Sequence, residues 1–132
     1  MFNKDLSQLA LDMIDANPNL WYQKVYHYYS PCGLAHCWIG WCDVLSGNWK
    51  GDMGSVSQKT MDLMGLSSYR YFEFINPYNS LARLKALHTF NITGVYGING
   101  YDADGYDRYK LDRNGYSRDE MAMTKELLMY GS

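Results

Sequence analysis

The sequence predicts a mainly α-helical fold, a small single-domain helical bundle around one buried central helix at about residues 33–46. The first observation is an apolar stripe at helical spacing within this stretch. The second is a series of short amphipathic segments, each bounded by residues that cap or end helices. The third is the length of 132 residues, which is enough for one domain, residues 1–132, to bury a core.

The predicted central helix carries two tryptophans and two cysteines on one face, which indicates that it is buried. Burial of a large side chain contributes roughly 1.5–3 kcal/mol to folding. Gly47 is expected to end this helix. Gly40, in its middle, predicts a close neighbour, and we expect a crossing helix there. The residues of the stripe are Leu34, Cys37, Trp38, Trp41, Cys42 and Leu45.

Short helices are predicted on both sides of the central one, to give five helices and a helical core over residues 1–90. Residues 6–14 form the first helix, with Asn3 or Asp5 as its cap, and Pro18 follows its end. The run 25–29 is β-branched and aromatic, which is typical of a short strand or an extended connector. Three later helices are expected to begin near Ser55–Gln58, which fits a capping box, at Ser67 or Ser68, and at Ser80.

Residues 91–117 form a turn-rich segment that, from residue 98, repeats every five residues with the pattern x-x-Gly-Tyr-Asp. Glycine after asparagine or aspartate is typical of tight turns, because glycine accepts a positive φ without strain. The third copy is degenerate. Ser117–Glu120 fits another capping box, which predicts a terminal helix over residues 117–130.

Composition excludes several classes of partner. The net charge of −2 does not favour nucleic acid or an anionic membrane. The sequence contains no apolar run of the roughly 20 residues that span a bilayer, and no secretory signal. We therefore expect a protein that functions inside a cell, with no cofactor and an open oligomeric state.

Three cysteines and three histidines form the one constellation that suggests reaction chemistry. A thiol at a helix N-terminus beside an imidazole is activated as a nucleophile. Cys32 or Cys37, with His27 or His88 as base, is therefore an alternative catalytic site for a hydrolase or transferase. The Cys-Gly…Cys-Trp order is similar to papain-type cysteine peptidases, but its spacing differs.

A zinc site is the second alternative for these side chains, with His27, Cys32, His36 and Cys37 as ligands. The five-residue cysteine spacing lacks the paired pattern of structural zinc sites. The aspartates of the repeats likewise do not match a calcium loop. We expect the thiols to be small buried hydrophobic groups and the histidines to be hydrogen-bonded polar groups.

The tyrosines of the repeats are the predicted binding residues. The chain has thirteen tyrosines, and tyrosine combines an apolar ring with a hydrogen-bonding tip, which suits interface anchoring. The predicted set is Tyr101, Tyr106, Tyr109 and Tyr116.

About residues 6–87 resemble small uncharacterised proteins of phages and bacteria, which implies a location in the host-cell cytoplasm or a virion. The resemblance is carried by residues 17–23, His27, residues 32–41 and residues 63–66. The pattern of these proteins consists of four motifs in order: P-x-x-W-x-Q, Trp-His, C-G-T-x-x-C-x-A-G-W and L-G-L. The Gly-Tyr-Asp repeats of the present chain are similar to tracts that also occur in phage proteins. The resemblance implies a phage or bacterial origin and a helical domain. The expected function is non-enzymatic binding of a phage structural or host protein, as a virion component or an accessory factor.

Overall fold

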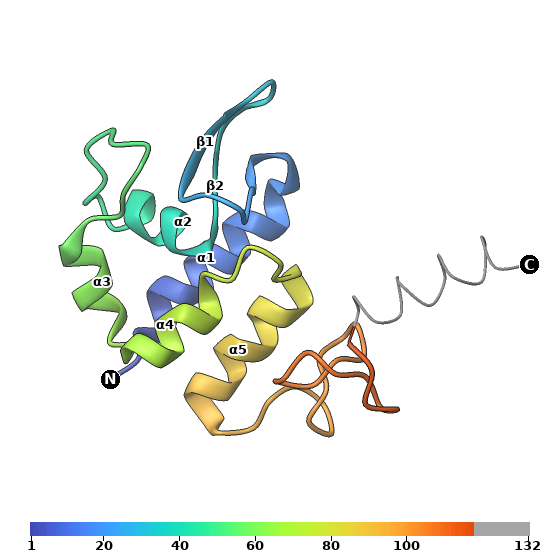
Figure 1. The fold of residues 1–132 in the computed structure, drawn as a ribbon. Helices are drawn as coiled ribbons and strands as arrows, with labels where there is room; N and C mark the ends of the chain where they lie inside the picture. The colour runs from blue at the N-terminus through green and yellow to red at the C-terminus, as the bar shows by residue number, and fades with distance from the viewer. Residues whose placement is uncertain (118–132) are drawn as a thin grey trace, which may run out of the picture.

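The structure is a computed structural model, and it describes residues 1–117. Helix α1 lies against both α2 and α5, while the β1–β2 hairpin projects beyond α1 and α2 (Figure 1). The chain then continues past α5 into a compact series of turns. The elements are α1 (Lys4–Ala16), the 3-10 helix η1 (Pro18–Leu20), β1 (His27–Ser30), β2 (Gly33–His36), α2 (Trp38–Leu45), α3 (Gln58–Met64), α4 (Ser68–Phe74) and α5 (Leu81–Thr93).

The prediction of a helical bundle around a helix at residues 33–46 is wrong. Residues 33–36 form strand β2, and the helix α2 begins only at Trp38. Gly33 has a φ of +126°, which starts β2 in a conformation that a helix does not allow. The strand pairs antiparallel with β1, with Ser30 opposite Gly33 and His27 opposite His36. The fold is therefore a set of helices with a two-stranded antiparallel sheet.

The buried character of the central stretch is confirmed even though its secondary structure differs. Trp38 is fully buried and stacks on Phe74 at 4.0 Å between ring centroids. Cys37 and Cys42 also lie in the core, as expected for small apolar groups. Leu34 lies on the strand instead of the helical stripe.

Gly40 has the close neighbour that its position predicted, but the neighbour is not a helix. A Cβ atom at Gly40 would lie 2.0 Å from the carbonyl oxygen of Tyr26, on the chain that leads into β1. The backbone N–H of Cys37 donates to the same carbonyl at 3.2 Å. The absent side chain of Gly40 thus allows α2 to pack directly on the hairpin.

Several helix caps agree with the sequence. The side chain of Asn3 accepts the N–H of Leu6 at 3.1 Å and starts α1. Ser67 and Ser80 cap α4 and α5 in the same way. The third helix begins two residues later than the capping box suggested, because Ser57 is its cap. The predicted terminal helix, 117–130, lies outside the described residues except for Ser117.

None of the helices among residues 1–117 has both the length and the apolar character that a membrane span requires.

Candidate functional site

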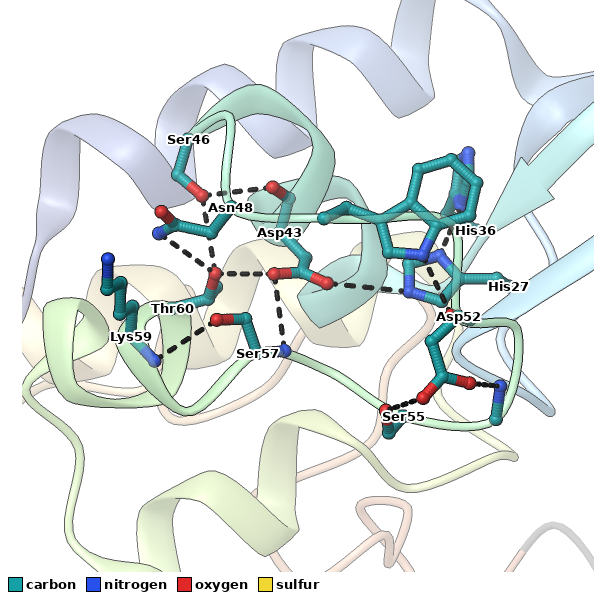
Figure 2. A network of polar contacts seen from close by, with 12 residues as sticks. His27, His36, Asp43, Ser46, Asn48, Asp52, Ser55, Ser57, Lys59 and Thr60 are labelled. Carbon is teal, nitrogen blue, oxygen red and sulfur yellow. Dashed lines mark hydrogen bonds and ion pairs between the residues drawn. The ribbon is translucent and has the colours of Figure 1, made fainter.

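A buried polar network joins the hairpin to α2 and α3, with the Asp43 carboxylate at its centre (Figure 2). Its Oδ1 accepts hydrogen bonds from the Thr60 hydroxyl at 2.6 Å and from the Ser57 backbone N–H at 3.3 Å. Its Oδ2 faces Nε2 of His27 at 3.5 Å. Because Asp43 and Thr60 are at most 1% exposed, the two hydrogen bonds to Oδ1 replace water that this oxygen gives up on burial, whereas Oδ2 has no hydrogen-bond partner within residues 1–117.

The two histidines of the hairpin contact each other directly. The Nδ1 atoms of His27 and His36 are 2.7 Å apart, which leaves room for one proton between them. The nearby Asp43 carboxylate favours a proton on Nε2 of His27, so we assign Nδ1 of His27 as acceptor and Nδ1 of His36 as donor. The ring of Trp49 stacks on His27 at 4.5 Å, and Trp41 meets the ring of His36 edge-on at 4.7 Å.

Burial keeps both imidazoles neutral at pH 7. It lowers the pKa of His27, against the opposing effect of the Asp43 carboxylate. Burial and the neighbouring His27 lower the pKa of His36 to about 4. The two imidazoles thus share one hydrogen bond, whereas Nε2 of His27 and Oδ2 of Asp43, 3.5 Å apart, have no hydrogen-bond partner within residues 1–117.

The cysteines of the alternative catalytic site are not brought together with an activating imidazole. Cys37 lines a cavity together with His27, but burial raises the pKa of its thiol to about 11. Cys42 is fully buried, and burial raises its pKa further. Cys32 is exposed at the hairpin turn, next to the Ser30–Gly33 end of the sheet and away from the His27–His36 end.

His88, the other candidate base, lies elsewhere in the core. Its Nδ1 is 2.7 Å from the hydroxyl of Ser7, which connects α5 to α1. Burial lowers its pKa, and Asp12 opposes this effect. Of the four alternative zinc ligands, the structure joins only His27 and His36. Within residues 1–117, no cluster of three or more histidine, cysteine, aspartate or glutamate side chains is arranged to hold a metal ion.

The repeats form a regular series of tight turns, here called the repeat coil (residues 98–117). Each turn begins at an aspartate whose Oδ1 accepts the backbone N–H groups two and four residues later, at 2.8–3.1 Å. The backbone N–H of the same aspartate donates to the carbonyl four residues later at 2.8 Å. The aspartates are Asp102, Asp107 and Asp112. Their carboxylates thus act as turn-forming groups.

The degenerate third copy keeps the backbone of the others. Lys110 occupies the glycine position with a φ of +68°, close to the +88° of Gly105 and the +84° of Gly115. Leu111 occupies the tyrosine position, and its N–H bonds to Asp107 at 3.0 Å. The aspartate therefore determines the turn more strongly than the glycine or the tyrosine does.

Two arginines attach the repeat coil to the helices. The buried Arg83 of α5 donates to the backbone carbonyls of Asp107 at 3.2 Å and Arg108 at 2.9 Å. Arg108 in turn forms two hydrogen bonds of 3.1 Å with the carboxylate of Glu73 on α4. Arg108 thus connects the repeat coil to α4 through an acid that precedes it by 35 residues.

The structure separates the predicted binding tyrosines into two classes. Tyr101 and Tyr106 are half-buried in the repeat coil, whereas Tyr109 is 72% exposed and Tyr116 is 55% exposed. Only the exposed pair presents its rings to a partner without rearrangement.

Two exposed aromatic residues that sequence reasoning missed lie on α4, and one of them, Tyr69, is near Arg108, the chain neighbour of Tyr109. Tyr69 and Phe72 are 64% and 65% exposed on α4, three residues apart and hence on one face of the helix. The Arg108 guanidinium lies 5.8 Å from the ring of Tyr69. Its pKa is raised mainly by the Glu73 hydrogen bonds, and additionally by the phenols of Tyr69 and Tyr109. We call Tyr69, Phe72 and Tyr109 the aromatic patch. In the sequence, Tyr69 and Phe72 stand three residues apart after the predicted Ser67 cap, and this spacing could have indicated that both lie on one face of the helix.

Comparison of the chain with protein-family models, curated proteins and solved structures found no match.

Proposed function

We propose that this protein is a non-enzymatic binding protein that recognises another protein through the aromatic patch. The observation that carries the proposal is the Arg108–Glu73 pair, which links the repeat coil to α4, where Tyr69 lies near the guanidinium. Tyr109, next to Arg108 in the chain, and Phe72, on the same helical face as Tyr69, are also exposed, so that each of the three aromatic residues is at least 64% exposed. Aromatic and arginine side chains are enriched at the centres of protein interfaces, where they supply much of the binding energy.

The surroundings of Arg108 support this proposal because they hold its guanidinium, which lies beside the aromatic patch, in place before binding. The guanidinium contacts the ring of Phe90 at 4.3 Å and bonds Glu73 through two nitrogens. A side chain that is already ordered loses less conformational entropy when a partner covers it. Tyr116, on the same repeat coil, is a further candidate contact, and from the resemblance we expect the partner to be a phage structural or host protein.

The test is site-specific photo-crosslinking in the source organism. A photoreactive phenylalanine analogue replaces Tyr69 or Tyr109 in turn, and covalent partners are identified by mass spectrometry. The matched control position is Leu63 of α3, which is 48% exposed on another part of the molecule. We expect one protein to be crosslinked from both patch positions and not from the control.

The purified partner then permits an affinity measurement. Tyr69→Ser and Tyr109→Ser should each weaken binding at least tenfold, because each removes an anchoring ring, while Leu63→Ser leaves binding unchanged. Equal crosslinking from all positions, or full binding by the two patch variants, contradicts the proposal. Unfolding of these variants contradicts it too, because exposed rings should contribute little to folding.

A further inference from the structure

A second arginine, Arg70, lies beside the aromatic patch. It follows Tyr69 on α4, and its guanidinium is 4.2 Å from the centroid of the Phe90 ring. Arg108 contacts the same ring at 4.3 Å. Phe90 belongs to α5, which packs against α4, so one ring can meet a guanidinium from α4 and another from the repeat coil. The two arginines therefore form one cationic cluster on Phe90, next to Tyr69.

One carboxylate, that of Glu73, faces both arginines, and Arg108 occupies it. Arg108 donates to both oxygens of Glu73 at 3.1 Å. The Nη1 atom of Arg70 is 4.0 Å from Oε1 of Glu73, which is beyond hydrogen-bond distance. This Nη1 atom is buried, and within residues 1–117 it has no hydrogen-bond partner. The cluster thus sets two guanidiniums against one carboxylate, and Arg70 carries the charge that is not compensated.

Coverage of the patch by a partner would change the surroundings of Arg70. Its side chain is 34% exposed, so water still hydrates part of it in the free protein. A partner that covers Tyr69 and Arg108 also displaces water from Arg70, because both guanidiniums contact one ring. Burial of an unpaired guanidinium is costly unless the incoming surface supplies an acceptor, and a carboxylate matches its planar geometry with two parallel hydrogen bonds.

We propose that the partner bound at the aromatic patch brings an acidic side chain that pairs with the guanidinium of Arg70. This inference rests on the proposed function and specifies the chemistry of the partner, which presents an aspartate or glutamate at the edge of an apolar area. The aromatic rings supply contact area, while the ion pair fixes the orientation of the partner and speeds association. The attraction is local, since the whole chain carries a net charge of −2.

The experiment measures the affinity of the purified protein that is crosslinked from Tyr69 and Tyr109. Arg70→Gln should weaken its binding about tenfold or more, because the acidic side chain of the partner is then buried without a cation. Arg70→Lys keeps the charge and should lose less. The control is Lys59→Gln on α3, an exposed position that removes the same charge and should leave the affinity within about twofold of the wild type. Added salt should weaken the binding of Arg70→Gln less steeply than that of the wild type.

The amine introduced by Arg70→Lys also identifies the acidic residue. A carbodiimide joins an amine to a carboxylate that contacts it, with loss of water, and mass spectrometry of the crosslinked peptides locates both residues. The acidic residue of the partner is then replaced by its amide counterpart. In a double-mutant cycle with Arg70→Gln, the two changes together should weaken binding little more than either does alone, because both remove the same ion pair.

Full affinity of Arg70→Gln, with binding still weakened by Tyr69→Ser, overturns this inference and leaves the proposed function intact. Additive effects in the double-mutant cycle also overturn it, because Arg70 would then act without contacting that acid. If Tyr69→Ser and Tyr109→Ser bind with full affinity, the proposed function fails and this inference fails with it. If Arg70→Gln does not fold, the amide variant of the partner and the salt dependence of wild-type binding decide the question.

Discussion

The contact between Gly40 and the Tyr26 carbonyl leaves no room for a side chain. Gly40→Ala would place a Cβ atom 2.0 Å from a backbone oxygen, so α2 or the hairpin must shift. We expect a loss of about 3 kcal/mol in the free energy of unfolding, measured by urea denaturation. The control is Gly54→Ala, where the nearest neighbour of the added Cβ atom would be the Asp52 carboxylate at 3.7 Å, and which should change stability by less than about 0.5 kcal/mol. Equal stability of the two variants would contradict this packing.

Lys110 adopts a left-handed conformation that costs a non-glycine residue about 1 kcal/mol. Lys110→Gly should therefore be more stable than Lys110→Ala by about this amount, since both remove the same side chain and only glycine relieves the strain. Hydrogen exchange of the Leu111 and Tyr116 amides measures the local effect. An alanine variant as stable as the glycine variant would show that the turn differs from the one described.

The three thiols should differ strongly in reactivity. Cys32 is exposed, whereas Cys37 and Cys42 are at most 2% exposed and their pKa values are raised by burial. Alkylation of the native protein at pH 7 should modify Cys32 first and the other two only on unfolding, as read by mass spectrometry. Rapid modification of Cys37 in mild acid would instead favour the cysteine-dependent enzyme.

Among the elements, the repeat coil depends on Arg83 for its attachment to α5. Arg83→Met leaves the Asp107 and Arg108 carbonyls without their donor, and hydrogen bonds to charged groups contribute about 1.5–3 kcal/mol each. We expect amide exchange in the repeat coil to accelerate at least tenfold while α1 and α2 stay protected. Arg113→Met, which removes a guanidinium 5.2 Å from the Tyr101 ring, is the control and should have a smaller effect. Uniform acceleration throughout the protein would mean that the coil and the helices unfold together.

At the scale of the whole molecule, three buried neutral histidines make stability depend on pH. Burial lowers the pKa values of His27, His36 and His88 in the folded state, that of His36 to about 4. Below pH 6.5 the unfolded chain therefore binds more protons than the folded one, and stability falls as the pH decreases toward 4. His36 accounts for a loss on the order of 3 kcal/mol over this range.

Urea denaturation between pH 7.5 and pH 4.5 checks this dependence. The control is His36→Gln, whose amide donates to Nδ1 of His27 but does not titrate, so its stability should fall less steeply over the same range. A wild type that is equally stable at pH 7 and pH 5 would show that the imidazoles are not buried as described.

Local features of the fold were predictable because neighbouring residues decide them. The Asn3, Ser67 and Ser80 side chains each bond to the N–H group three residues later, so their effect is visible in a short window. The five-residue turns are predictable for the same reason, since each aspartate bonds N–H groups only two and four residues later. The thiol and indole stripe likewise indicated burial correctly.

Contacts between distant segments decided the rest. Residues 33–36 carry part of a helical stripe, yet they form a strand because pairing with residues 27–30 satisfies their backbone groups. The histidine pair, the Arg83 attachment and the aromatic patch likewise bring together side chains from separate elements, and no local pattern encodes such distances. Helix capping and turn formation could thus be predicted from the sequence itself. The strand pairing, the buried histidine pair and the aromatic patch depend on long-range packing, which local propensity does not report.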